Sequence, residues 1–243
     1  MLIEDERELH IRGLRIDWDK IDRRSYLWNI PAIAGVNDLT FHKPITFFVG
    51  ENGSGKSTLL EAIAVAYGFN PEGGTKNYSF STYDSHSQLH DAMRIVKGRF
   101  KPGWGYFLRA ESFYNVATAE EEYNREYGKS LHFHEKSHGE SFLAMAQNNF
   151  KQNGVYLLDE PEAALSPQRQ LTLLLEIMEC AKKESQFIIV SHSPILLGMP
   201  NAEILSFDDG EIHPCEYEAT DSYKVTEMFI NSRELILKRL LEG

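Results

Sequence analysis

A glycine-rich run in the first quarter of the chain has the residue types and the spacing to hold a phosphate group. Its sequence, Gly-Glu-Asn-Gly-Ser-Gly-Lys-Ser, fits the pattern G-x-x-x-x-G-K-[ST]. The glycines let several backbone N–H groups point at one phosphate chain, and the N-terminus of a following helix adds partial positive charge. We therefore expect a nucleoside triphosphate to bind Gly50, Glu51, Asn52, Gly53, Ser54, Gly55, Lys56, Ser57 and Thr58.

Lys56 and Ser57, within this run, have side chains suited to separate tasks. The ammonium group of Lys56 would reach the β- and γ-phosphates, and the hydroxyl of Ser57 would ligate Mg²⁺. Downstream, the apolar stretch Val155–Leu158 ends in two acids, Asp159 and Glu160. Asp159 would hold Mg²⁺ through its water shell, and Glu160 would orient the attacking water or act as its general base. An acid pair that follows such a loop favours hydrolysis of the triphosphate.

His192 follows the last strongly apolar stretch, Phe187–Val190. A continuous apolar run of this length is typical of a strand buried on both faces of a parallel sheet. At the end of such a strand, a histidine can hydrogen-bond the γ-phosphate and the water, and so respond to whether the phosphate is present. We therefore predict three catalytic residues, Lys56, Glu160 and His192.

The elements that must position these residues follow from the hydrophobic pattern. The β-rich stretch Ile45–Val49 precedes the glycine run, and apolar residues at helical spacing follow it as far as Tyr67. Ser137–Ser141 opens another helix of apolar periodicity and would form a second anion site. Ligands sit at the carboxyl ends of strands in open parallel sheets, and the predicted strand Trp104–Ala110 ends there, directly before Glu111.

The hydrophobic pattern also predicts elements away from this group. Two short strands flank the turn Asp208–Gly210. The others are a strand at Leu9–Ile16, a short helix carrying Leu89, Met93 and Val96, a long helix that begins at Ser166–Pro167 with Leu171, Leu174, Leu175 and Met178 as apolar positions, and a helical tail at Ser222–Leu241.

The overall composition is that of a globular protein with a sizeable core. The chain has 243 residues, of which 42% are hydrophobic and 25% are charged. No apolar run is long enough to span a bilayer, and the acidic N-terminus is unlike a signal peptide. The two cysteines, Cys180 and Cys215, lie far apart and do not suggest a disulfide. We therefore expect a cytoplasmic protein with no membrane partner.

The formal net charge of −11 argues against a surface broadly devoted to nucleic acid. One short window nevertheless holds four cations, Arg94, Lys97, Arg99 and Lys101. No stacking aromatic residues are interleaved with them at regular spacing, so a solvated face is favoured. A nucleic-acid groove is the less favoured alternative.

Five motifs in order resemble those of an ABC-type ATPase. Gly50–Ser57, Ser137–Ser141, Leu157–Glu160, Ala164–Pro167 and His192 correspond to its Walker A, signature, Walker B, D-loop and H-loop. The residues in and around these motifs are most similar to those of the stand-alone bacterial predicted ATPases of the AAA domain type. These are relatives of the RecF and SMC heads rather than of transporter subunits.

The resemblance implies one ATPase domain over residues 1–243, with an α/β P-loop NTPase fold of the ABC head type. Its central sheet would be mostly parallel, with an antiparallel β part at the N-terminus and a helical lid inserted at about residues 69–136. It also implies that two heads sandwich two ATP molecules, so that Ser137 and Gly139 of one chain act on the nucleotide of the other. Glu111 lies where the family has a glutamine in its Q-loop.

Two residues depart from the family pattern. His138 replaces the first glycine of the signature, and Glu111 is an acid rather than an amide. We expect an Mg²⁺-dependent ATPase whose nucleotide cycle closes and opens a homodimer. The alternatives are a slow ATP-gated switch that controls a partner protein, a DNA repair or maintenance ATPase and, least favoured, a transporter ATPase subunit.

Overall fold

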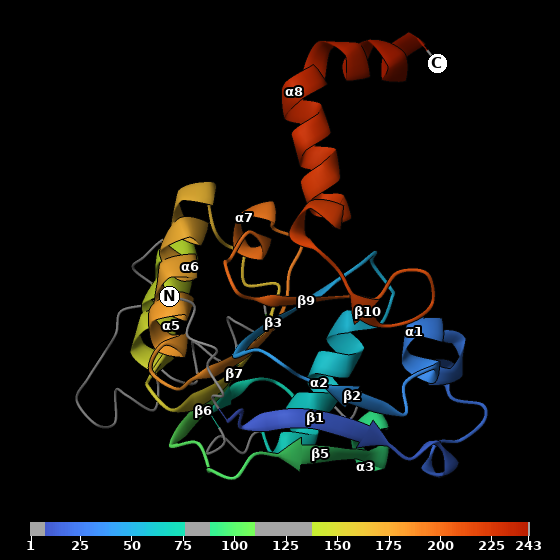
Figure 1. The fold of residues 1–243 in the computed structure, drawn as a ribbon, viewed down its shortest axis with the longest axis vertical. Helices are drawn as coiled ribbons and strands as arrows, with labels where there is room; N and C mark the ends of the chain where they lie inside the picture. Colours follow the sequence, from blue (N-terminus) through green and yellow to red (C-terminus); the bar gives the residue numbers. More distant parts are fainter. Residues whose placement is uncertain (1–7, 76–87, 110–137, 243) are drawn as a thin grey trace.

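A seven-stranded, mostly parallel sheet runs through the centre of the protein (Figure 1). The computed structural model describes residues 8–75, 88–109 and 138–242. The strand order is β10-β9-β3-β8-β7-β6-β4, in which the two edge strands pair antiparallel and the others pair parallel. The strands are β3 (Ile45–Val49), β4 (Gly74–Thr75), β6 (Trp104–Arg109), β7 (Gly154–Asp159), β8 (Gln186–Val190), β9 (Glu203–Ser206) and β10 (His213–Pro214).

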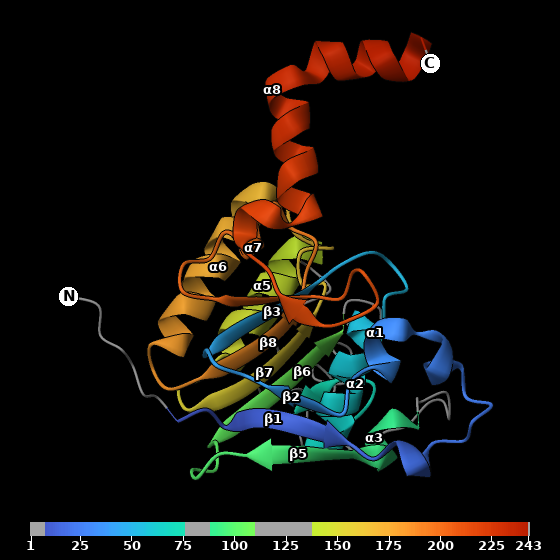
Figure 2. The same ribbon diagram turned by 45° about the vertical axis from the view of Figure 1, so that its right-hand side comes forward.

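A second, three-stranded sheet is antiparallel and lies on one side of the central sheet (Figure 2). Its order is β2-β1-β5, formed by β2 (Asp38–Thr40), β1 (Ile11–Ile16) and β5 (Met93–Lys97). Helix α2 (Lys56–Tyr67) lies between the two sheets, because it contacts β5 on one side and both β7 and β8 on the other. The predicted combination of a mostly parallel central sheet and an N-terminal antiparallel part is confirmed.

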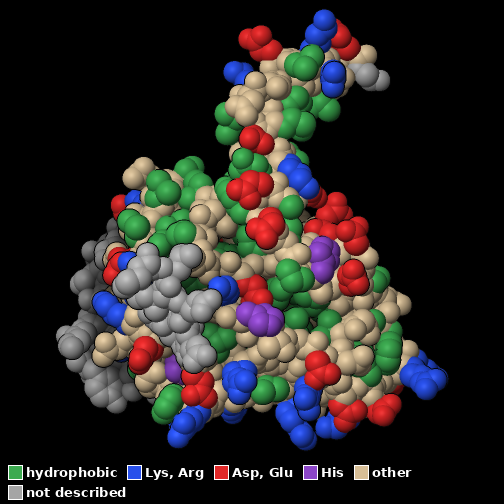
Figure 3. Space-filling view, in the orientation of Figure 1, with side chains coloured by type: hydrophobic (Ala, Val, Ile, Leu, Met, Phe, Trp, Pro, Cys, Tyr) green, Lys and Arg blue, Asp and Glu red, His purple; other side chains and the backbone are tan. Residues whose placement is uncertain are grey.

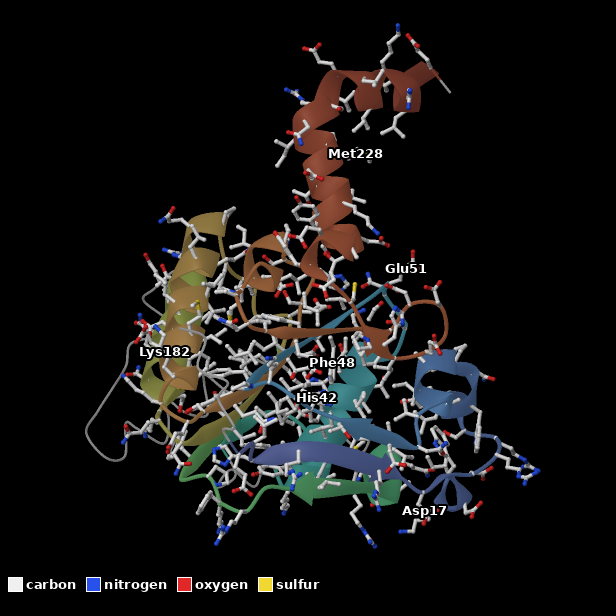
Figure 4. The ribbon with its side chains drawn as sticks, in the orientation of Figure 1. Asp17, His42, Phe48, Glu51, Lys182 and Met228 are labelled. Atoms are coloured by element: carbon white, nitrogen blue, oxygen red, sulfur yellow. The ribbon has the colours of Figure 1, made fainter. Side chains whose placement is uncertain are left out.

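The inner strands of the central sheet are buried on both faces, as their continuous apolar runs predict. Alternate side chains enter two separate cores. Phe48 and Ile188 face the core that surrounds α2, whereas Phe47 and Phe187 face the core on the opposite side of the sheet. Figure 4 shows Phe48 well inside the body of the protein.

Two long helices cover the second face of the central sheet. Their buried side chains include Phe142 and Met145 of one helix and Leu173 and Ile177 of the other. The helices are α5 (His138–Asn149) and α6 (Pro167–Ala181), and the shorter elements of the fold are η1 (Trp18–Lys20), η2 (Tyr26–Asn29), α1 (Pro31–Ala34), α3 (Leu89–Ala92), α7 (Pro194–Leu197) and η4 (Tyr217–Ala219).

The last helix, α8 (Asp221–Glu242), rises from the body and is bent near its middle (Figures 1 and 2). The bend coincides with Ser232, whose φ of −137° and ψ of 31° are not helical. The predicted helical tail is therefore confirmed. Within the described parts of the chain, no helix combines the length and the apolar character needed to cross a bilayer. Cys180 and Cys215 are both free thiols.

One local prediction is wrong. The short helix predicted to carry Leu89, Met93 and Val96 ends at Ala92, and the next five residues form β5 because their backbone pairs with β1. The long helix predicted from Ser166–Pro167 forms as α6, in which Leu174 and Met178 pack partly buried against the core, whereas Leu171 and Leu175 are exposed. Of the predicted insertion at 69–136, the described parts contribute β4, β5 and β6 to the sheets, and the remainder lies outside the described residues.

Candidate nucleotide-binding site

Three loops meet at the carboxyl edge of the central sheet. Because β3, β8 and β7 are parallel neighbours in register, Phe48 lies beside Val190, and Val190 lies beside Asp159. The glycine loop after β3, the acid pair at the end of β7 and the histidine after β8 therefore lie at one edge, as open parallel sheets favour. Figure 4 shows Glu51 of the glycine loop at the side of the body from which α8 rises.

The glycine loop has the curled backbone that a phosphate-binding loop requires. Gly50, Gly53 and Gly55 have φ values of +136°, +83° and +100°, which residues with a Cβ atom rarely adopt. Helix α2 begins directly afterwards at Lys56, so its N-terminal N–H groups face the loop. This arrangement places backbone donors and the positive end of a helix dipole around one small volume.

Lys56 is buried within this loop, with 4% of its surface exposed. Its ammonium group donates hydrogen bonds to the carbonyl oxygens of Gly50 at 2.7 Å and Glu51 at 2.6 Å. Burial lowers the pKa of Lys56, and the nearby carboxylates of Asp208 and Glu160 oppose this shift. The lysine is thus held at the centre of the loop by backbone oxygens that an incoming phosphate could replace.

Ser57 and Asp159 are in direct contact although 102 positions separate them. The Ser57 hydroxyl donates a hydrogen bond to Oδ1 of Asp159 at 2.8 Å. The hydroxyl and the carboxylate lie next to each other beside the phosphate-binding loop. Oxygen donors of this kind are the ligands that Mg²⁺ prefers. The two residues predicted to hold the metal therefore fit it in both chemistry and position.

Glu160 and His192 face each other across the ends of β7 and β8. Nε2 of His192 lies 3.9 Å from Oε1 of Glu160, and this nitrogen is buried without a hydrogen-bond partner among the described residues. Glu160 has a φ of +47°, and its N–H donates to the Val190 carbonyl at 3.0 Å. A glutamate in this left-handed conformation costs free energy, which the contacts around it must offset.

A sequence model of a protein family, described as an AAA domain, matches residues 24–189 and thus more than half of the chain. The chain belongs to this AAA domain family. The matched region contains the glycine loop and the acid pair, and it ends just before His192. A search of the curated proteins found no match. The family makes this AAA domain a P-loop NTPase.

A search of the solved structures found matches to this AAA domain at low sequence identity. An SMC head domain from Thermotoga maritima is 17% identical, with 74% of this chain and 93% of that chain covered and a TM-score of 0.42. An SMC head bound to the C-winged helix domain of ScpA is 17% identical, with 86% and 99% covered and a TM-score of 0.46. An ATP-binding cassette of an ABC transporter is 14% identical, with 94% and 98% covered and a TM-score of 0.44.

Glu162, which the sequence prediction missed, connects the acid loop of the AAA domain to its histidine loop. Its Oε1 accepts hydrogen bonds from the Ser191 hydroxyl at 2.9 Å, the His192 N–H at 2.6 Å and the Ser193 N–H at 3.2 Å. Burial raises the pKa of this carboxyl group, although these hydrogen bonds act in the opposite direction. The sequence contains no direct signal for this role, because its partners lie about thirty residues away.

Asp208 is the second residue that the sequence prediction missed. Its Oδ1 accepts a hydrogen bond from the N–H of Glu51 at 2.9 Å, and its Oδ2 accepts one from the Ser206 hydroxyl at 3.1 Å. A Cβ atom on Gly50 would lie only 2.9 Å from the same Oδ1. Asp208 therefore fixes the start of the glycine loop from the end of β9, and a side chain at position 50 would disturb this contact.

The remaining predicted site residues are placed only in part. Glu111 and Ser137 lie outside the described residues, whereas Gly139 is the second residue of α5. The four cations of the basic window are on β5, a strand of the three-stranded sheet, and on the loop after it, whereas the glycine loop follows β3 of the central sheet. One of them, Lys97, holds its ammonium group 5.3 Å from the centre of the Tyr67 ring.

Proposed function

We propose that this AAA domain is an Mg²⁺-dependent ATPase whose nucleotide cycle closes and opens a homodimer. The observation that carries the proposal is the convergence of Lys56, the Ser57–Asp159 contact and the Glu160–His192 pair at one sheet edge. A buried cation, a pair of metal-ligating oxygens and a carboxylate beside an imidazole are the groups that phosphoryl transfer to water needs.

Lys56 would exchange its hydrogen bonds to the loop carbonyls for bonds to the β- and γ-phosphate oxygens. Because burial lowers its pKa, the lysine gains most from an anionic partner, and a triphosphate supplies one. Ser57 and Asp159 would hold the metal, Ser57 directly and Asp159 through water. When bound, Mg²⁺ supplies positive charge beside the phosphate oxygens.

Glu160 would orient the attacking water and accept its proton. His192 lies beside it and would donate a hydrogen bond from Nε2 to the γ-phosphate, the task for which this buried nitrogen is free among the described residues. A hydrogen bond that depends on the γ-phosphate would distinguish ATP from ADP. Catalysis would then consist mainly of positioning and charge stabilisation.

The partner chain would complete each site. Gly139, the second residue of α5, and Ser137, which precedes the helix in the sequence, would approach the γ-phosphate held by the other copy, and Glu111 would take part in nucleotide binding at the Q-loop position. The family resemblance supports this arrangement, in which neither chain hydrolyses ATP efficiently alone. A cytoplasmic location agrees with the free thiols of Cys180 and Cys215.

Hydrolysis is tested by measuring ATP binding and turnover separately. We expect Lys56→Ala to abolish binding, and Glu160→Gln to bind ATP normally but to turn it over at least about a hundredfold more slowly. Glu211→Gln, which alters an exposed glutamate between β9 and β10, is the matched control and should behave as wild type. Normal ATP affinity in Lys56→Ala would overturn the assignment of the glycine loop.

Whether the signature residues of one chain act on the nucleotide bound by the other chain is tested by mixing two inactive variants. Lys56→Ala lacks a functional P-loop, and Gly139→Asp lacks a functional signature. In a mixed dimer, the intact P-loop of one chain faces the intact signature of the other, so an equal mixture should regain about a quarter of wild-type turnover. A mixture that stays inactive although the two chains associate would overturn the sandwich.

A further inference from the structure

The C-terminal helix α8, hereafter the arm, carries exposed apolar side chains along its length, and within the described part of the chain it contacts the body mainly at its base, through α7 and η4. All of its 22 residues are described, and none is buried. Figure 3 shows hydrophobic side chains distributed along it where it stands clear of the body. Seven large apolar side chains are between 41% and 85% exposed, namely Val225, Met228, Phe229, Ile230, Leu235, Leu240 and Leu241.

The spacing of these side chains is that of a helix that packs against another helix. Before the bend at Ser232, Val225 is three residues from Met228 and four from Phe229, so these three side chains share one side of the arm, and Leu235 and Leu240 add exposed apolar surface after the bend. Helices that gain nothing from packing are marginally stable in water, and exposed apolar stripes of this extent mark interaction surfaces. The arm therefore needs a partner helix.

Charge favours a second copy of the arm as that partner. The arm contains four acids and four bases, so the net charge of −11 belongs entirely to the rest of the chain. Before the bend at Ser232, acids outnumber bases by one, and after it bases outnumber acids by one. Two antiparallel arms would place these unlike halves opposite each other, whereas the acidic bodies repel. A neutral polar face offers little attraction to a membrane surface or to nucleic acid.

The base of the arm lies at the edge that carries the candidate site. Thr220 is buried and caps the helix through its hydroxyl, which accepts a hydrogen bond from the Tyr223 N–H at 3.3 Å. The next residues, Asp221 and Ser222, line a cleft of about 490 Å³ together with Gly50, Glu51, Asn52 and His192. Paired arms would thus join two copies on the side where each P-loop must meet its partner.

We propose that the arm pairs antiparallel with the arm of a second copy and holds two chains together without nucleotide. This pairing deepens the proposed function, because it turns closure of the ATP sandwich into an event within one assembly. Tethering of this kind raises the effective concentration of the second chain to about the millimolar range. The P-loop edges of two chains can then associate even when the cellular concentration of the protein is low.

The test compares solution masses without nucleotide at micromolar concentration. We expect wild type to be a dimer and the triple variant Met228→Gln, Phe229→Gln and Leu235→Gln to be a monomer with an unchanged unfolding transition, because these side chains touch no core. Leu171→Gln with Leu175→Gln, which alters two exposed leucines of α6, is the matched control and should stay dimeric. A monomeric wild type, or a dimeric arm variant, would overturn the proposal.

A fourth substitution, added to the triple arm variant, separates this proposal from the proposed ATPase cycle. Glu160→Gln is added to the arm variant, and the mass is measured with Mg²⁺-ATP and with Mg²⁺-ADP. If the arm variant is monomeric with ADP and dimeric with ATP, both proposals hold. If it binds ATP and remains a monomer, the sandwich fails while the arm pairing stands. If it is dimeric with both nucleotides, the arm pairing fails.

Discussion

The backbone nitrogen of His192 lies 2.6 Å from Oε1 of Glu162, so the loop after β8 is attached to the loop after β7. The same oxygen also binds Ser191 and Ser193, and the Ser193 hydroxyl in turn accepts hydrogen bonds from the first N–H groups of α7. One carboxylate oxygen therefore determines the path of three residues around the histidine. Glu162 is a positioning residue, since it acts on the site through His192.

Removal of this carboxylate should impair turnover more than nucleotide binding. We expect Glu162→Ala to lower kcat by about tenfold to a hundredfold, because small displacements of a positioned group cost this much, and to leave the KM for ATP nearly unchanged. Glu162→Gln keeps an oxygen that can accept the His192 N–H and should retain most of the wild-type kcat. Steady-state kinetics of both variants make the comparison, and equal kcat values for Glu162→Ala and wild type would refute it.

The same residue should give the folded state a distinctive pH dependence. Burial raises the pKa of Glu162 above its ordinary value of 4.5, so the folded state holds this proton to higher pH than the unfolded state does. The resulting contribution to the free energy of unfolding is fully present below 4.5 and is lost as pH rises through the raised pKa.

Urea unfolding over a pH series measures this contribution. Between the ordinary glutamate range and neutrality, wild type should lose stability relative to Glu162→Gln, which has no proton to lose at this position. Glu211→Gln removes an exposed carboxylate and should follow wild type across the series. A constant difference in stability between wild type and Glu162→Gln would show that burial of this carboxyl has no such effect.

Asp208 should stabilise the nucleotide-binding form of the glycine loop through one hydrogen bond. Asp208→Ala leaves the Glu51 N–H without its partner, and we expect the Kd for ATP to rise by about threefold to tenfold, equivalent to about 1 kcal/mol. Asp208→Asn loses the charge but keeps an acceptor oxygen for the Glu51 N–H. It is therefore the matched control, and the difference between the two variants measures the hydrogen bond alone. Titration calorimetry measures both variants. An equal increase in Kd for both would attribute the effect to charge.

The parts of the site that lie within one motif could be predicted from the sequence. The glycine loop is local, and the strands before it and before His192 are continuous apolar runs, a pattern that buried parallel strands produce directly. Parallel neighbours end at the same edge, so the contact between Ser57 and Asp159 followed from the order of the motifs.

Contacts that depend on tertiary structure could not be predicted in this way. Glu162 and Asp208 look like ordinary loop acids, because their partners are about 30 and 157 positions away. The five residues of β5 have only Met93 buried, so their pattern fits a helix as well as a strand, and pairing with β1 decides between them. In α6, the rotation of the helix on the sheet selects Leu173 over Leu171.

Two glycines of the loop allow the cost of backbone strain to be measured apart from the cost of steric overlap. Gly53 has a φ of +83°, and a Cβ atom there would meet nothing within 4 Å. Gly55 has a φ of +100°, and its Cβ would lie 2.6 Å from Cγ1 of Ile33 and 2.8 Å from Cγ2 of Ile30. Substitution by alanine therefore strains the backbone at both positions and crowds the core at Gly55 alone.

We expect Gly53→Ala to lower the free energy of unfolding by about 1 to 2 kcal/mol, the cost of a left-handed residue with a Cβ atom. Gly55→Ala should cost a further 1 to 3 kcal/mol or so, because Ile30 and Ile33 must move in a packed core. Urea unfolding of the two variants gives this difference. The double variant Gly55→Ala with Ile33→Val removes Cδ1 of Ile33, which would lie 3.1 Å from the added Cβ, and should recover part of the additional loss. If Gly53→Ala and Gly55→Ala are equally destabilised, α1 does not restrict the position of the glycine loop.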